Sequence, residues 1–225
     1  MASMYALRRV LRSRAARMCR PHARTCAPRR LGGEVVQHMA ADAGFPACVR
    51  VHSFEVWPGR TLAVCGFSRV SNAADLLAAL RAKALDVALL HAPHVAGLEP
   101  LLVAANKALY YQLALKKLRA SSLHAELLLC LLAGKNVMEA FKQMGGRATS
   151  TDIIVAIFDA TPADVRRVCD LVAGDLVDPV TLLGACVDTA ALVKQYKVSA
   201  EELSVGSLAD AVMGRIAVQE YTVAL

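Results

Sequence analysis

The side chains that could do chemistry are histidines and cysteines, and few of them lie close together in the sequence. Only Ala-Pro separates His91 from His94, and no carboxylate or cysteine is near, so we favour a histidine pair that binds no metal. His124 and Cys130 are the nearest candidates for a base and a nucleophile. On the strand that we expect at 127–132, their separation corresponds to about 20 Å. We therefore predict no metal site and no catalytic residue.

Sequence motifs of nucleotide binding and hydrolysis are absent. Gly134-Lys135 is followed by Asn136, where a phosphate-binding loop needs a serine or threonine to hold magnesium. The sequence contains no Gly-x-Gly-x-x-Gly, Gly-x-Ser-x-Gly or His-Glu-x-x-His pattern. Its acids are scattered singly, apart from Glu201-Glu202. We expect a protein that is not an enzyme and has no cofactor.

The cysteines do not form a disulfide or metal-binding pattern. There are seven of them, an odd number, and none is part of a Cys-x-x-Cys motif. Four lie inside apolar runs, where a free cysteine behaves as a small hydrophobic residue: Cys65, Cys130, Cys169 and Cys186. We predict buried, reduced thiols in a reducing compartment.

The positive charge of the chain is concentrated at its N-terminus. Residues 1–33 hold nine of the 26 basic residues, all arginines, and none of the 19 acids, so 17 bases and 19 acids remain in 34–225. The net charge of +7 therefore belongs to a basic leader, which we place at 1–40. Its composition is typical of a mitochondrial or plastid transit peptide. A flexible basic arm, or upstream translation of a chain that starts near Met39, are the alternatives.

The remaining sequence alternates short apolar runs with helix-length segments. Strands are expected at 61–67, 86–90, 127–132 and 152–158. Helices are expected at 71–85, 98–118 and 136–145, from Pro162, at 179–196 with a break near Gly184, from Ser199, and at 207–220. This pattern predicts an α/β (mixed α+β) domain over residues 51–221, with a small mixed sheet of four to five strands and about seven helices. Its apolar stretches are too short to span a membrane.

Polar residues are expected to begin several of these helices. Ser71 is a candidate cap for the first helix. Asn136 with Glu139, and Ser199 with Glu202, have the spacing of a capping box, in which two side chains satisfy each other's backbone amides.

The last helix is apolar over an unusually wide arc. One face carries Leu208, Ala211, Val212, Arg215 and Ile216, and the side next to it carries Ala209, Met213 and Ala217. Such a helix is either buried on two sides within the chain or presents one side to a partner. The sequence leaves both interpretations open.

A second segment of interest lies between Glu99 and Glu126, where basic residues occur without any acid. On a helix, Lys107 lies about 180° from Lys116, so the cations do not form one stripe. A basic patch would need help from loops, and ordinary solvated lysines are the alternative interpretation. Tyr110 and Tyr111 are the nearest aromatic residues.

Five ordered segments resemble the TPRKB family, the kinase-binding subunits of the KEOPS (EKC) complex. They are 67–76, the signature helix 101–109, 136–145, 193–199 and 202–216. The resemblance spans about 51–221. The basic leader is a departure from the family, and Arg119-Ala120-Ser121 matches its Lys/Arg-Thr/Ser pattern only approximately.

The resemblance implies a function that this sequence does not reveal by itself. Members of the family are not enzymes. They bind the N-terminal lobe of a small kinase-like ATPase, which contacts the subunit that transfers threonylcarbamoyl to the adenosine next to the tRNA anticodon. Archaeal relatives also hold the 3′ CCA end of the tRNA. A location in cytoplasm and nucleus is implied, against the mitochondrial or plastid location that the leader suggests.

The resemblance also implies site residues. Those expected to contact the kinase-like subunit are Leu208, Ala211, Val212, Arg215 and Ile216. Those expected to contact tRNA are Asn106, Lys107, Lys116, Lys117 and Arg119. The alternative function is an organelle-targeted RNA- or small-molecule-modifying enzyme of mixed α/β fold, which predicts a closed polar pocket.

Overall fold

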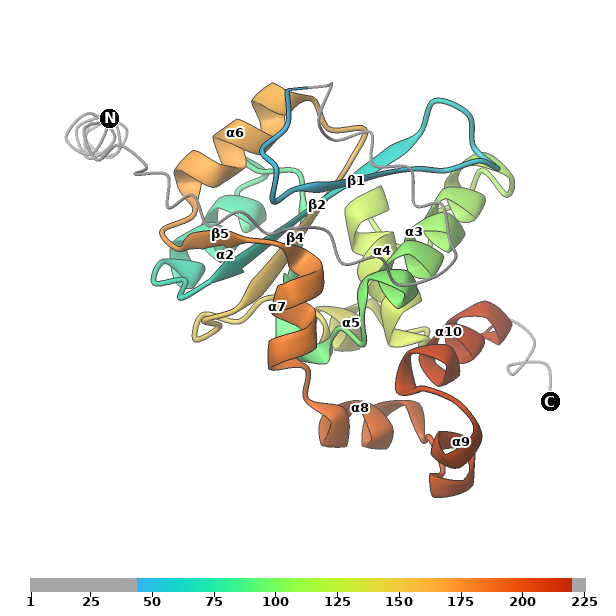
Figure 1. The fold of residues 1–225 in the computed structure, drawn as a ribbon. Coiled ribbons are helices and arrows are strands. Elements are labelled where there is room, and N and C mark those ends of the chain that lie inside the picture. The colour runs from blue at the N-terminus through green and yellow to red at the C-terminus, as the bar shows by residue number, and fades with distance from the viewer. Residues whose placement is uncertain (1–43, 220–225) are drawn as a thin grey trace. The chain divides into compact units, whose positions relative to one another are not determined.

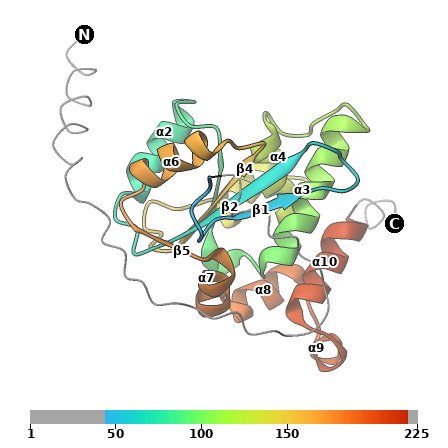
Figure 2. The same ribbon diagram turned by 45° about the horizontal axis from the view of Figure 1, so that its top comes forward.

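A computed structural model describes residues 44–219, so the basic leader lies outside the described residues. Within this range the chain forms one five-stranded sheet and nine α-helices, which confirms the mixed α+β class (Figures 1 and 2). Over residues 44–219, no helix has the length and apolar character needed to cross a membrane.

The sheet is antiparallel at every pairing. Its order is β1 (Arg50–Ser53), β2 (Thr61–Ser68), β4 (Ile153–Phe158) and β3 (Ala88–His91), while β5 (Asp175–Val177) also pairs with β2. We predicted a mixed sheet. β2 and β3 do run parallel, but β4 lies between them and runs opposite to both, so no parallel pair forms.

The sheet is covered by helices on both faces, which explains why its strands are continuous apolar runs. On β4, Ile154, Ala156 and Phe158 belong to one core cluster, and Ile153, Val155 and Ile157 belong to the other. Helices α3 (Leu98–Leu113) and α4 (Leu123–Leu132) pack on the first cluster. Helices α2 (Ala73–Arg81) and α6 (Pro162–Leu171) pack on the second.

The other helices extend the first layer. They are α5 (Val137–Gln143), α7 (Pro179–Cys186), α8 (Thr189–Tyr196), α9 (Ala200–Val205) and α10 (Leu208–Val218), with a 3-10 turn at Ala92–His94. In sequence α10 lies about a hundred residues beyond α3, yet it packs against α3 and α4 (Figure 1). The last helix is therefore part of the main core.

The strand predicted at 127–132 is wrong, because these residues belong to α4. The Ser122 hydroxyl accepts from the Ala125 amide and begins the helix, and Ala133 ends it in a left-handed conformation. Residues 124–131 are all buried, so the helix has no polar face to reveal its period. His124 and Cys130 therefore share a helix, where six residues correspond to a rise of about 9 Å.

Two of the three predicted caps are confirmed as side-chain N-caps, although neither is a full capping box, and Glu139 and Glu202 accept hydrogen bonds from Gln143 and Arg215. The Asn136 side chain accepts from the amides of Met138 and Glu139, and the Ser199 hydroxyl accepts from the amide of Glu202. Ser71 is not a cap. Helix α2 begins at Asn72 without a side-chain cap, and the Ser71 hydroxyl donates to Ala173 instead.

The helix count differs from the prediction for identifiable reasons. The sequence indicated about seven helices; α4 adds one, and the break near Gly184 separates α7 from α8 at residues 187–188. Strands β1 and β5 were not predicted. They are four and three residues long, and each pairs with only part of the same edge of β2.

Candidate functional site

One face of α10 is buried within this chain. Ala211, Val212 and Ile216, three of the residues expected to contact a partner, are exposed by only 7%, 1% and 0%. They join the core that α3 and α4 build on the sheet. Burial within the chain, the alternative that the sequence left open, is thus what the structure shows for these three side chains.

Arg215 holds α10 to the two helices before it. Its guanidinium forms two hydrogen bonds to the Glu202 carboxylate, at 2.6 and 2.7 Å, and its Nε donates to the Tyr196 carbonyl at 2.9 Å. The hydrogen bonds to Glu202, together with its charge, raise the pKa of Arg215. Leu208, at the first turn, is half-buried against the core. Arg215 thus fixes α10 against α8 and α9, a role that the sequence spacing did not reveal.

The opposite side of α10 faces outward and is also apolar. We call it the α10 outer face; its exposed residues are Gly214, Ala217 and Val218, and Ala209 and Met213 at its border are half-buried. Val218 is 49% exposed, and the space around Gly214 is open. The exposed Asp210 lies among these positions and is the one charged residue of this face, where it forms the capping box with Ser207. A solvated helix face usually carries more charge.

The C-terminal half of α3 lies beside the end of α10. The Lys107 ammonium group donates to the Ile216 carbonyl at 2.6 Å. One turn further along α3, Tyr110 and Leu113 are 41% and 37% exposed. These two large apolar side chains lie on the same helix as Lys107, three and six residues beyond it.

Two residues expected to contact tRNA instead hold neighbouring elements together. Lys107 satisfies a carbonyl in the last turn of α10, where the helix dipole favours a cation. The Asn106 carbonyl oxygen accepts from the Trp57 indole at 2.7 Å, so it links α3 to the hairpin between β1 and β2. Each interaction gives the side chain a structural role.

Arg119 belongs to a partly buried cluster. Its Nε and backbone amide donate to the fully buried Glu126 carboxylate at 2.6 and 2.7 Å, and its guanidinium lies 3.9 Å from the centre of the Tyr111 ring. Burial raises the pKa of the neighbouring Cys130 thiol to about 12. The cluster therefore orders the loop between α3 and α4, and Cys130 remains a protonated, unreactive thiol at neutral pH.

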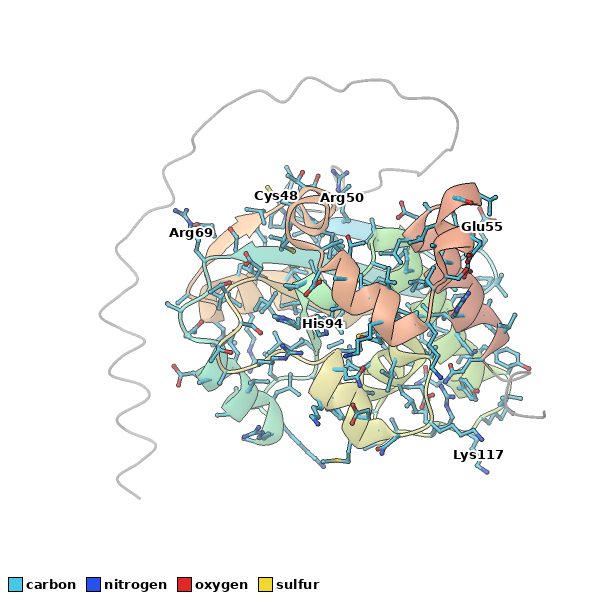
Figure 3. The ribbon with its side chains drawn as sticks, turned by 90° about the horizontal axis from the view of Figure 1, so that it is seen from below. Cys48, Arg50, Glu55, Arg69, His94 and Lys117 are labelled. Carbon is cyan, nitrogen blue, oxygen red and sulfur yellow. The ribbon has the colours of Figure 1, made fainter. Side chains whose placement is uncertain are left out.

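Lys116 and Lys117 differ from the other basic residues of this region because both are exposed. Figure 3 shows Lys117 directed outward from the loop that follows α3. Of the five residues expected to contact tRNA, these two are the ones whose charged groups are offered to solvent.

The histidines are engaged in local hydrogen bonds. His91 Nδ1 lies 2.9 Å from the Ser150 hydroxyl, and the His94 Nδ1–H donates to the Gln143 carbonyl at 2.8 Å. The two rings meet edge to face, with centres 5.0 Å apart. Across residues 44–219, no group of three or more His, Cys, Asp and Glu side chains is placed to hold a metal.

His124 joins three elements. The ring is nearly buried and its pKa is lowered by burial, so it is neutral at pH 7. Its Nδ1–H donates to Asp86 at 2.9 Å, and its Nε2 accepts from the Phe158 amide at 3.2 Å. Cys130 interacts with Arg119 and Glu126 instead.

Among residues 44–219, the exposed part of α10 is thus an apolar helical surface. Residues 67–220 match the family model described as Kinase binding protein CGI-121, so the chain belongs to this family. It is 29% identical over 156 residues to the EKC/KEOPS complex subunit TPRKB of the zebrafish Danio rerio. That alignment covers 68% of this chain and 88% of the zebrafish protein. The matched region runs from the end of β2 through α10.

Proposed function

We propose that this chain is a non-catalytic subunit of an EKC/KEOPS complex, and that it binds the kinase-like ATPase subunit through the α10 outer face. The family description supports kinase binding, and the zebrafish relative is a subunit of that complex. The observation that carries the location is the side of α10 on which Gly214, Ala217 and Val218 are exposed and Ala209 and Met213 are half-buried.

The physical character of this face suits a protein partner. Ala209, Gly214 and Ala217 have little or no side chain, so a partner can approach the helix backbone closely. Tyr110 and Leu113 are exposed large apolar groups on α3, the helix that packs against α10. Exposed apolar surface of this kind is favourable to bury, at about 25 cal/mol per Å². The five residues first assigned to the partner contact are therefore replaced by their neighbours on the other side of the helix.

The test is co-purification of the full chain with the kinase-like subunit from the same source, by size-exclusion chromatography. Ala217→Arg places a charged side chain on the α10 outer face and is expected to weaken the complex by about tenfold or more. Ala78→Arg is the matched control, because Ala78 is an exposed helical alanine on α2. A complex that is equally stable in both variants would contradict the proposed location, and no complex with the wild-type chain would contradict the function.

The family resemblance also suggests the reaction that the complex supports, which is the modification of tRNA. The kinase-like subunit would in turn contact the subunit that transfers threonylcarbamoyl to the adenosine next to the anticodon, and this chain would support that reaction by holding the tRNA 3′ CCA end. Lys116 and Lys117 support a tRNA contact, because both are exposed. Their double change to alanine should reduce tRNA affinity several-fold in a filter-binding assay at constant salt. Unchanged affinity would argue against this contact.

The proposed location is the cytoplasm and nucleus, with a mitochondrion or plastid as the alternative. The test is fusion of residues 1–40 to a fluorescent reporter. A diffuse signal would support the first location, and an organellar signal the second.

A further inference from the structure

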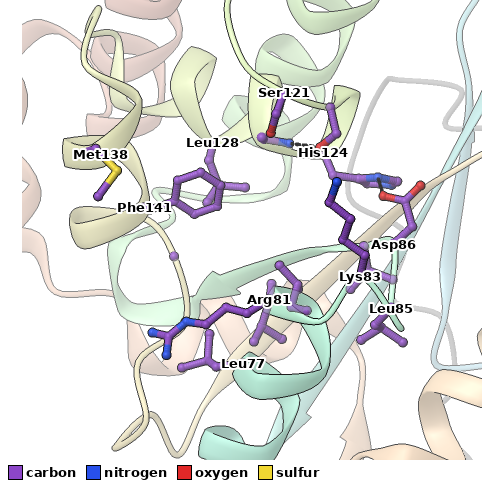
Figure 4. Close-up of a pocket in the computed structure, with 17 residues that line it drawn as sticks. Leu77, Arg81, Lys83, Leu85, Asp86, Ser121, His124, Leu128, Met138 and Phe141 are labelled. Atoms are coloured by element: carbon purple, nitrogen blue, oxygen red, sulfur yellow. Dashed lines mark hydrogen bonds and ion pairs between the residues drawn. The ribbon is translucent and has the colours of Figure 1, made fainter.

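A second exposed apolar surface lies between α2, α5 and the start of α4. It is a groove with a volume of about 730 Å³, shown in Figure 4. None of the residues that line it belongs to α3 or α10. The groove and the α10 outer face are therefore separate surfaces, and one partner bound at α10 would not use the groove residues.

The walls of the groove are mostly aliphatic. Leu77 and Leu80 come from α2, Leu128 from α4, and Met138 and Phe141 from α5. Met138 is 76% exposed and Phe141 is 39% exposed, although both are large apolar side chains. Figure 4 shows the Phe141 ring directed toward Leu128. Large apolar groups left open to water beside a hollow indicate an interaction surface.

The charged residues of the groove are predominantly positive. Arg81 and Lys83 are exposed, and neither forms a salt bridge with any residue between 44 and 219. The one acid in the lining, Asp86, already accepts a hydrogen bond from His124. The first turn of α4 also borders the groove, and its amide end adds partial positive charge. The site thus combines an apolar floor with two cations that lack a partner.

We propose that this groove binds an acidic amphipathic segment of a partner protein, with its aliphatic side chains between α2 and α5 and its carboxylates at Arg81 and Lys83. Helical segments commonly dock in apolar grooves in this way. A nucleic acid fits the groove less well, because bases bind by stacking on aromatic rings and Phe141 is the one aromatic ring of Phe, Tyr or Trp type in the lining.

The experiment measures binding to the purified full chain by fluorescence anisotropy at physiological salt. The first probe is a fluorescein-labelled peptide of about 14 residues, or four helical turns, with leucines at helical spacing and glutamates elsewhere. The second probe replaces every glutamate by lysine, and the third is a single-stranded oligoadenylate of similar length. We expect the acidic peptide to bind more tightly than the other two probes.

Variants distinguish binding at the groove from binding at the arginines of the leader. Every variant retains these arginines, so a change in affinity reports on the substituted residues. Arg81→Glu with Lys83→Glu should weaken the acidic peptide about tenfold, equal to 1.4 kcal/mol. Arg166→Glu with Lys194→Glu is the matched control, because both residues are exposed, outside the groove, and give the same change of charge. Met138→Ser should weaken binding severalfold.

Three results would overturn the proposal. Equal losses in the two double variants would assign binding to net charge rather than to the groove. Equal affinities for the acidic and the basic peptide, or none for either, would remove the predicted specificity. Oligoadenylate binding that is tighter than peptide binding and is lost in Arg81→Glu with Lys83→Glu would make the groove a nucleic-acid site. Circular dichroism of each variant establishes that it is folded.

Discussion

Gly214 shows how one residue can separate the stability of the chain from its binding. It lies inside α10, and a Cβ added there would meet nothing within 4 Å. Glycine inside a helix costs up to about 1 kcal/mol relative to alanine. We therefore expect Gly214→Ala to stabilise the free chain by roughly that amount and, if the partner backbone approaches α10 closely, to weaken kinase binding.

The matched control for this prediction is Gly184, which lies inside α7 and is also surrounded by open space. Gly184→Ala should stabilise the chain by about as much, near 1 kcal/mol, without changing kinase affinity. Urea unfolding measures the stability, and isothermal titration calorimetry measures the affinity. If the kinase binds Gly214→Ala as tightly as the wild type, the α10 outer face is not closely packed in the complex.

At the same scale, His91 makes the stability depend on pH. Burial, together with the charges of Arg147 and His94, lowers its pKa from the ordinary 6.5 to about 4. Between these pH values, the unfolded chain therefore binds more protons than the folded chain. The contribution of His91 to the free energy of unfolding is fully present above about pH 6.5 and is lost as the pH falls toward 4.

Urea unfolding at pH 7 and pH 4.5 tests this expectation. His91→Gln should show a smaller loss of unfolding free energy between the two pH values than the wild type. A residual loss is expected in the variant, because burial also lowers the pKa of His52 and His124. Equal losses in the variant and the wild type would contradict the assignment to His91.

At the scale of elements, α10 has two apolar sides with different roles. Ile216 is fully buried, whereas Ala217 next to it is exposed. Truncating a buried isoleucine typically costs about 2–5 kcal/mol. Ile216→Ala should therefore lower the unfolding free energy of the free chain by that amount, and Ala217→Ser should change it by less than about 0.5 kcal/mol. Chemical denaturation without the kinase measures both. Similar small effects would mean that α10 does not pack on α3 in solution.

Elements were predictable where apolar and polar residues contrast clearly along the sequence, and they were missed or misassigned where this contrast is absent. The strand at Ile153–Phe158 was recognisable because six apolar residues, five of them β-forming, lie between polar flanks. Helix α4 was mistaken for a strand because burial on all sides removes the helical period. Strands β1 and β5 were missed because such short edge segments depend on pairing with β2, which is a tertiary contact.

The sequence indicated which helix carries the candidate site, but not which side of that helix is exposed. The wide apolar arc of α10 was visible in the sequence, and so were Ala209, Met213 and Ala217 beside it. Which side is buried depends on α3, about a hundred residues earlier in the chain, and on the Lys107 contact to Ile216. The groove at Met138 and Phe141 had no sequence signal, because its walls come from three separate helices.

At the scale of the whole molecule, charge is divided unequally along the chain. Residues 1–33 hold nine arginines and no acid, while residues 34–225 hold 17 bases and 19 acids. Binding to nucleic acid without sequence preference depends on the number of phosphates that are neutralised. We therefore expect most of the salt-dependent affinity of the full chain for RNA to come from its first 33 residues.

The measurement is tRNA affinity as a function of salt for the full chain, for a chain that begins at residue 34, and for Lys116→Ala with Lys117→Ala. Each contacted phosphate contributes about −0.7 to −0.9 to the slope of log K against log salt. Removal of the leader should flatten the slope by several units, and the double variant by no more than about two. Because a specific contact also depends on tRNA shape, the shortened chain should still prefer tRNA over a tRNA that lacks its 3′ CCA end. Equal slopes with and without the leader would place the RNA-binding charge in the folded domain instead.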